Sequence, residues 1–300
     1  MKTSLLLTAL SFPVCLFAQQ VSDTTFRPEI RNPEYRFGKG PIVMIDEAHH
    51  NFHNKDGRYG PFAYLLERDG YVVKGFTGEF TPENLSKTKI LVISNALNEI
   101  NEENWYLPTP SAFTPGEIIA VQQWVEQGGR LFLIADHMPL AGAAKELAAA
   151  FGFEFSNGFA VDTTRQGTAF FSREENTLAD NNITNGRNPA ERIDKIATFT
   201  GQAFRIPADA TPILTFGKHY INLMPDTAWV FTDKTPTISA EGWSQGAYKK
   251  SGKGKVVVFG EAAMFTAQLS GSPARKVGMN DPAAGQNYRL LLNIMHWLDR

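Results

Sequence analysis

The sequence has 300 residues, of which 43% are hydrophobic and 12% aromatic, and its formal net charge is −2. This composition supplies enough apolar residues for a large core and excludes wholesale disorder. The 29 basic and 31 acidic residues nearly balance, so we expect no nucleic-acid partner.

The first 20 residues have the pattern of a secretory signal peptide. Lys2 precedes an apolar run from Leu5 to Ala18, which ends at Gln19 and Gln20. The run is too short for a membrane span, so we expect an exported protein, periplasmic or secreted, with no span after leader cleavage. The only cysteine, Cys15, lies in this leader, so the mature chain should have no disulfide and no cysteine nucleophile.

The rest of the chain predicts a single α/β domain over residues 41–300, preceded by a polar, extended lead-in over 21–40. Short β-branched runs alternate with helical stretches, which is the βαβ pattern of a parallel sheet. The expected strands cover residues 42–45, 71–74, 89–94, 130–135 and 255–260. The expected helices cover residues 61–68, 82–87, 141–151 and 287–298, and a further helix follows Thr114.

The segment from Thr114 to Glu117 predicts a well-defined helix start. Thr114 supplies an N-cap hydroxyl, Pro115 takes the first helical position, and Glu117 follows three residues after the cap. Ile118, Val121 and Val125 then recur at helical spacing, so this helix should bury one face.

Residues 153 to about 250 interrupt the alternation. Polar segments such as "ADNNITNGRNP" separate short β-like runs such as "TPILTF" and "TAWVF". We therefore predict a β-rich insertion in the α/β domain. The glycines of "SGKGK" precede a strand rather than a helix, so they predict a hairpin turn and not a phosphate loop.

Ionisable side chains follow the predicted parallel strands. They are Asp46, Glu47, His49 and His50 after "IVMI", Asp136 and His137 after "LFLIA", and Glu261 after "VVVFG", with Asn95 after "LVIS". The carboxyl ends of parallel strands lie along one edge of the sheet, which is where such folds bind ligands. We therefore expect these side chains to meet in one crevice.

Carboxylates and imidazoles in a crevice suit either acid/base chemistry or the binding of a divalent metal. The predicted site residues are Asp46, His49, Asp136, His137 and Glu261, with Glu47 and His50 as second choices. If a metal is bound, its expected ligands are His49, His137 and Asp136, while another carboxylate activates its water.

Structural roles remain open for the same residues. Asp46 and Asp136 are also suited to capping the turn after each strand, and Glu261 to the first turn of a helix over "AAMFTAQL". His50 and His53 fit surface or packing positions, and we assign His219 and His296 to structure. Ser94 ends a strand without a nucleophile elbow, so a serine hydrolase is not favoured. Aromatic residues in or beside loops fit ordinary packing or a sugar-binding face: Phe52, Tyr59, Trp105, Phe113, Phe171 and Trp243.

Four segments resemble the class I glutamine amidotransferase-like superfamily: "VMIDEAHHNFH", "GRLFLIADH", "GKGKVVVFGEAAMFTAQ" and "NYRLLLNIMHWLD". Within it, the chain is similar to the bacterial domains known as DUF4350-like, which are related to auxiliary domains of gliding-motility transporters. The resemblance spans roughly residues 41–152 and 251–300. It implies a flavodoxin-like three-layer α/β sandwich.

The resemblance does not imply the activity of that superfamily. Its amidotransferases use a cysteine on a tight strand-to-helix turn, together with a His-Glu pair. This chain has Asp136 and His137 at the comparable strand end and no cysteine after Cys15, so we expect no glutaminase activity.

Two functions fit these observations. The first is a hydrolase that acts on a small polar or carbohydrate-derived substrate through the His/Asp/Glu crevice, with or without a metal. The second is a non-catalytic domain that binds a ligand or glycan, or serves as a scaffold. Convergence of the five site residues would favour the first function, and their dispersal along the edge would favour the second.

We predict that export removes the leader near Gln19 or Gln20, because the apolar run ends there. N-terminal sequencing of the exported protein should find its first residue next to this boundary. Exported protein that still begins at Met1 would contradict the prediction.

Overall fold

A nine-stranded sheet forms the centre of the protein. The structure is a computed structural model that describes residues 20–300. The predicted leader, Gln20 excepted, lies outside the described residues. None of the helices within 20–300 has the length and apolar character needed to cross a membrane.

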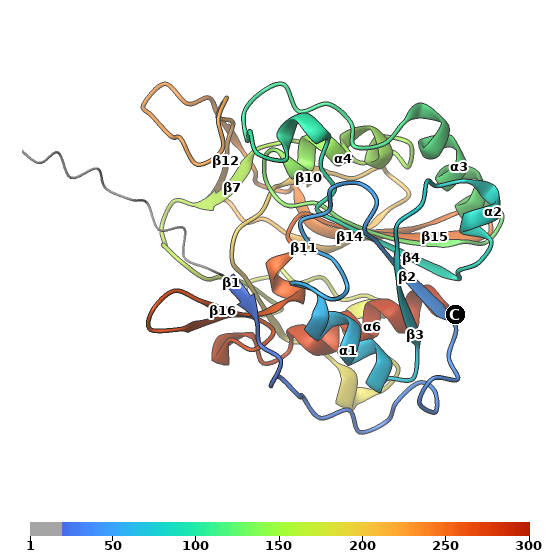
Figure 1. Cartoon of the computed structure of the whole chain (residues 1–300). Coiled ribbons are helices and arrows are strands. Elements are labelled where there is room, and N and C mark those ends of the chain that lie inside the picture. The colour runs from blue at the N-terminus through green and yellow to red at the C-terminus, as the bar shows by residue number, and fades with distance from the viewer. Residues whose placement is uncertain (1–19) are drawn as a thin grey trace, which may run out of the picture.

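Five adjacent strands of this sheet are parallel, and all five were predicted. They are β2 (Ile42–Asp46), β3 (Val72–Phe76), β4 (Ile90–Ser94), β5 (Arg130–Ile134) and β15 (Gly254–Phe259). Their order across the sheet is β3-β2-β4-β5-β15 (Figure 1). All five strands therefore point their carboxyl ends to the same edge.

The predicted insertion is rich in strands, but it is not separate from the sheet. Four of its strands extend the sheet beyond β15 in antiparallel fashion: β14 (Ser244–Ser251), β10 (Phe204–Arg205), β6 (Glu154–Phe155) and β11 (Thr211–Thr215). Others form small sheets: β7 (Phe159–Asp162), β12 (Tyr220–Leu223) and β13 (Thr237–Ser239), and β8 (Ala169–Ser172) with β9 (Lys195–Thr198). A third small sheet joins both ends of the chain: β1 (Gln20–Ser22), β16 (Ala267–Ser270) and β17 (Arg275–Gly278).

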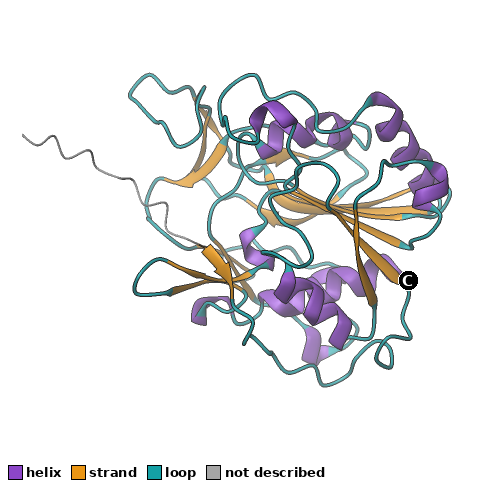
Figure 2. Ribbon diagram, in the orientation of Figure 1, coloured by secondary structure: helices purple, strands orange, loops and turns teal. Residues whose placement is uncertain are grey.

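Helices lie on both faces of the large sheet (Figure 2). The α-helices are α1 (Gly60–Arg68), α2 (Pro82–Leu85), α3 (Pro115–Glu126), α4 (Leu140–Ala149), α5 (Asn182–Asn185) and α6 (Asn287–Asp299). Single turns of 3-10 helix are η1 (Glu99–Asn101), η2 (Pro189–Glu191), η3 (Ala263–Phe265) and η4 (Pro282–Ala284). The predicted capping box of α3 is present, since Thr114 and Glu117 each bond the backbone of the other.

The strand β4 shows why the sheet is buried on both faces. Ile90 and Val92 pack in one core cluster with residues of α1 and α6, whereas Leu91 and Ile93 pack in a second cluster with α2, α3 and α4. Side chains alternate between the faces of a strand, so a continuous apolar run is what a sheet covered by helices on both sides requires.

The helix expected over "AAMFTAQL" is wrong. After the single turn η3, the chain extends into β16, which pairs with β1 on one side and β17 on the other. These two ladders satisfy the backbone of β16 and outweigh its local preference for helix, which is a weak determinant on its own.

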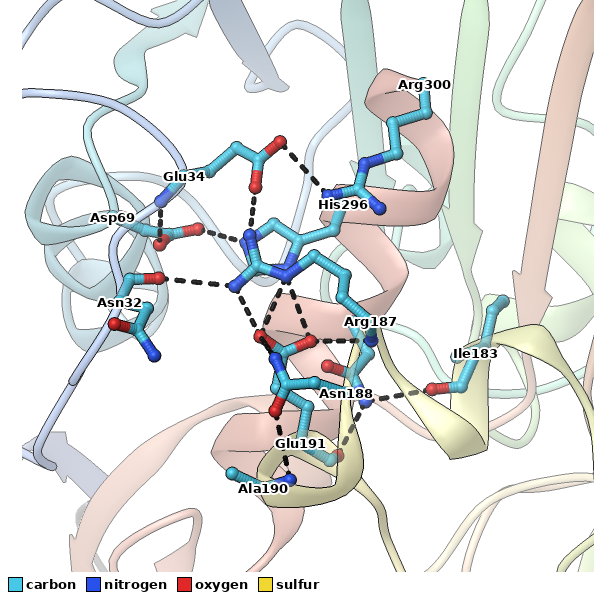
Figure 3. A network of polar contacts seen from close by, with 11 residues as sticks. Asn32, Glu34, Asp69, Ile183, Arg187, Asn188, Ala190, Glu191, His296 and Arg300 are labelled. Atoms are coloured by element: carbon cyan, nitrogen blue, oxygen red, sulfur yellow. Dashed lines mark hydrogen bonds and ion pairs between the residues drawn. The ribbon is translucent and has the colours of Figure 1, made fainter.

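A polar network on the lower part of the molecule joins segments distant in sequence (Figure 3). Asp69 ends α1 and is fully buried, and its carboxylate accepts bonds from His296 Nε2 at 2.6 Å and from the backbone N–H of Glu34 at 2.9 Å. Arg187 forms ion pairs with Glu34 and Glu191. The network therefore holds the lead-in against α1 and α6, and His296 has the structural role predicted for it.

Replacing His296 by alanine should lower the free energy of unfolding by about 3 kcal/mol, because the buried Asp69 carboxylate then lacks a principal partner. Urea unfolding at pH 7 measures this change. His219→Ala removes an exposed histidine and should change stability by less than about 0.5 kcal/mol. Equal stability of the two variants would contradict a structural role for His296.

Candidate functional site

The carboxyl edge of the parallel strands carries all five predicted site residues. Asp46 is the last residue of β2, Asp136 and His137 follow β5, and Glu261 follows β15. All five side chains are buried, with exposed fractions between 0% for Asp46 and Glu261 and 9% for Asp136. Buried polar groups need partners, so the partners decide what each residue can do.

His49 lies between two carboxylates. Its Nδ1 is 2.9 Å from both oxygens of Asp46, and its Nε2 is 3.0 Å from Oε1 of Glu117 at the start of α3. Burial lowers the pKa of His49, but the hydrogen bonds and charges of Asp46 and Glu117 outweigh it, so the pKa is raised. Both ring nitrogens are occupied, which leaves His49 no free atom for general-base catalysis.

Asn95 connects the ends of β4 and β5. Its Nδ2 donates to Asp136 Oδ2 at 2.9 Å, its Oδ1 accepts from the Asp136 backbone N–H at 2.8 Å, and Nδ2 also lies 3.1 Å from His53 Nδ1. Asn95 has a φ of +50°, a left-handed conformation that asparagine tolerates better than most residues. This conformation turns the amide across the edge of the sheet toward Asp136.

Asp136 and Glu261 are two buried carboxyl groups that follow β5 and β15. Asp136 Oδ1 accepts from the Ala262 backbone N–H at 3.2 Å, and Glu261 accepts from the Met264 N–H at 3.0 Å. Burial raises the pKa of Asp136 to about 6, against the hydrogen bonds of Asn95 and Ala262. Burial, followed by the charge of Asp136, raises the pKa of Glu261 well above its ordinary value. Asp136 is therefore a group of this edge whose protonation is poised near neutral pH.

His137 lies in a group of aromatic rings, away from the bonds of the carboxyl pair. Its ring stacks on Phe159 at 4.2 Å between centroids and meets the edge of Trp229 at 4.6 Å, while its Nδ1 bonds the Met138 carbonyl oxygen at 2.7 Å. Burial lowers the pKa of His137 to about 4, so the imidazole is neutral at pH 7. We refer to Trp105, His137, Phe159, Trp229 and Phe231 as the aromatic cage.

The predicted metal ligands are not brought together. His49 bonds Asp46 and Glu117, Asp136 bonds Asn95, and His137 packs in the aromatic cage. Among residues 20–300, no three His, Cys, Asp or Glu side chains are grouped so as to hold a metal ion. The described residues therefore give no support to a metal site formed by His49, His137 and Asp136.

The two second choices also have local partners. Glu47 Oε1 accepts from the Lys55 backbone N–H at 2.7 Å, and the Glu47 carboxylate packs over Gly75 of β3, where a Cβ would lie 2.4 Å from it. His50 is partly exposed and pairs with Glu102 at 3.0 Å. Glu47 therefore holds the loop after β2, whereas the contact of His50 with Glu102 lies at the surface.

Sequence reasoning missed three residues of this edge as site residues. Glu117 was recognised only as the acid of a capping box, and its contact to His49 spans 68 positions in sequence. Asn95 carried a weak signal, an asparagine directly after a strand. Trp229 carried none, since only the folded chain places it against His137.

The fold has clear likenesses among solved structures, although no protein-family model matches the sequence and a comparison with curated proteins finds no match. The mmIFT52 N-terminal domain is similar with a TM-score of 0.61 at 13% identity, over 86% of this chain and 97% of that one. The cytoplasmic protein STM3548 from Salmonella typhimurium is similar with a TM-score of 0.51 at 14% identity, over 87% and 99%.

A protein described as ThuA-like, from Bacteroides uniformis, has a TM-score of 0.49 at 13% identity, over 88% of this chain and 94% of that one. Identities this low concern the fold alone. The first two likenesses show that the chain has a known mixed α/β fold across most of its length.

The buried, neutral His137 should make the protein sensitive to acid. Its folded pKa of about 4 lies below the ordinary 6.5, so the unfolded chain binds a proton first as the pH falls. The free energy of unfolding should therefore drop by up to about 3 kcal/mol between pH 6.5 and pH 4 on account of this residue. Urea unfolding across this range should show a smaller drop for His137→Phe than for the wild type.

The variant His219→Phe is the matched control, because His219 is exposed. It should keep the pH dependence of the wild type. An identical drop in His137→Phe and the wild type would show that His137 is not held neutral by burial.

Proposed function

We propose that the protein is an exported member of the glutamine amidotransferase-like superfamily, of the DUF4350-like kind and with a flavodoxin-like three-layer sandwich. We further propose that it binds a small polar or carbohydrate-derived ligand at the carboxyl edge of its sheet without turning it over. The order β3-β2-β4-β5-β15 supports the sandwich, since it is the 2-1-3-4-5 order of flavodoxin-like sheets.

The partners of the ionisable residues favour binding over catalysis. Both nitrogens of His49 face carboxylates, Nδ1 of His137 bonds a carbonyl, and Glu261 is fully buried under backbone donors. Groups whose hydrogen-bonding capacity is used internally have little left for a substrate. His49, Asp136 and His137 each contact different partners, which we take as favouring a binding or scaffold domain.

The observation that carries the proposal is the position of Trp229. This side chain is 54% exposed although it contacts His137 and Phe159, so one part of the ring faces solvent beside the aromatic cage. Its backbone has a φ of +67° in a turn closed by a bond of 3.1 Å from Val230 N–H to the Thr227 carbonyl oxygen. A bulky residue is unfavourable there, and strain of this kind is concentrated at functional sites. An exposed, immobilised indole suits the apolar face of a sugar ring or a similar flat ligand.

Hydrolysis is the second candidate, and one observation favours it. Asp136 keeps 9% of its surface exposed and has a pKa raised by burial to about 6, next to a second carboxyl group on Glu261. A group with such a pKa can exchange protons near neutral pH, as a general acid or base must. Metal assistance is not included in the proposal, because the expected ligands lie in separate contacts.

The variant Trp229→Gly should lose ligand binding while still folding, because it loses the contacts to His137 and Phe159 but glycine adopts a positive φ without strain. Ligands are found by tryptophan fluorescence titration of the wild type with sugar acids, glucosamine and free amino acids. The fluorescence change should be absent in Trp229→Gly. Phe37→Ala removes an aromatic side chain that is 79% exposed elsewhere and should bind like the wild type.

The same proteins and one further variant, Asp136→Asn, are assayed for hydrolysis of nitrophenyl glycosides and esters between pH 5 and pH 8. If the protein only binds its ligand, it should hydrolyse these compounds no faster than the buffer alone does. A rate that changes near pH 6 in the wild type and disappears in Asp136→Asn would instead establish the hydrolase. Unchanged binding in Trp229→Gly would rule out the aromatic cage as the binding surface.

A further inference from the structure

A polar cavity is lined by residues of β7 and of the loop that follows it, together with residues at the start of β8 and the end of β9. Its volume is about 460 Å³, within the usual range for small-molecule sites. Hydroxyl groups dominate its polar lining, through Thr163, Thr164, Thr168, Thr198 and Thr200. We refer to it as the threonine cavity.

The side-chain oxygen of Gln245, a residue that lines the threonine cavity, lacks a hydrogen-bond partner within residues 20–300. The residue is 2% exposed, it lines the cavity, and its Oε1 accepts no hydrogen bond from the described residues. Exchanging the amide oxygen and nitrogen would leave a donor in the same unpaired position. Asn101, Asn222, Gln268 and Asn280 also have buried amide atoms without a partner in the described part of the chain, but Gln245 alone among these residues lines the threonine cavity, where a bound group can supply the missing donor.

The backbone around Gln245 brings this amide close to the carboxyl edge. Gly201 has a φ of +143°, and a Cβ there would lie 2.9 Å from Gln245 Nε2 and 2.9 Å from Glu261 Cβ. Only a glycine permits both approaches. The backbone N–H of Phe199, another lining residue, bonds the Glu261 carboxyl group.

The charges in the lining of the threonine cavity balance. Asp162 accepts from the backbone N–H and the hydroxyl of Thr164 at 2.8 and 2.7 Å, and Arg165 pairs with Glu175 at 3.7 Å. The lining itself has one acid, Asp162, and one base, Arg165, so it carries no net charge, and Glu175 lies outside it. The aromatic rings of Phe199, Phe216 and Tyr220 complete the lining.

From this lining we infer that the threonine cavity is a binding site for a neutral sugar, additional to the surface at Trp229. Hydroxyl groups donate and accept, so a ring carrying several of them can pair with the threonine hydroxyls and supply the donor that Gln245 Oε1 lacks. The aromatic rings suit the apolar face of the same sugar. A volume of about 460 Å³ admits a monosaccharide or a disaccharide.

The test measures binding of glucose, mannose, galactose, N-acetylglucosamine and maltose to the full mature chain by calorimetry and saturation-transfer NMR. At least one of these sugars should bind the wild type, and Gln245→Met, which keeps the side-chain length but removes the amide, should weaken it at least tenfold. Thermal unfolding of Gln245→Met should occur at the wild-type temperature or above, since the unpaired amide is gone. Trp229→Gly should retain the sugar affinity.

A sugar that binds Gln245→Met as tightly as the wild type would overturn the inference, as would the binding of none of these sugars. Equal loss in Gln245→Met and Trp229→Gly would show a single shared site and overturn the inference of a second one. If Gln245→Met does not fold, Thr168→Val replaces it in the test, because Thr168 is a half-buried residue of the cavity lining. It should also weaken sugar binding at least tenfold, and unchanged binding would overturn the inference.

Discussion

The reciprocal hydrogen bonds between Asn95 and Asp136 are the interaction on which the carboxyl edge depends. They join the ends of β4 and β5, and the same amide reaches His53. Through Asp136 the connection continues to the Ala262 N–H after β15. One side chain thus links the ends of β4 and β5 directly and that of β15 through Asp136, in a buried region where polar groups depend on one another for partners.

The hydrogen bonds that the polar groups of this edge make to one another limit the reactions that they can catalyse. A carboxylate or imidazole can serve a substrate or a metal only with an atom that is free or released on binding. His49 has no such ring atom, since Asp46 and Glu117 engage both nitrogens. The exposed ring of Trp229 and the unpaired amide of Gln245 are different, because each has contact capacity that the protein does not use. Both features point to binding rather than to acid/base work.

The sequence predicted what depends on local pattern. The five parallel strands follow from short apolar runs such as "ILVI", and the start of α3 follows from Thr114 and Glu117. The strand β16 could not be predicted this way, because its two pairing partners, β1 and β17, decide its conformation. The site shows the same division. Strand ends placed Asp46, Asp136 and Glu261 on one edge, but the contact of His49 with Glu117 depends on how a distant helix packs.

The position of β15 has a consequence for the order of folding. This strand lies between β5, its parallel neighbour, and β14, its antiparallel neighbour. Along the chain, β5 ends at Ile134 and β15 begins at Gly254, which is 120 positions later. Closing so long a loop costs chain entropy before any pairing is gained, which makes such contacts slow to form. During synthesis the sheet therefore stays open until almost the whole chain has been made. A chain whose sheet closes slowly stays unfolded for longer and can still pass through a membrane channel. This suits a protein that is exported before it folds, as we propose.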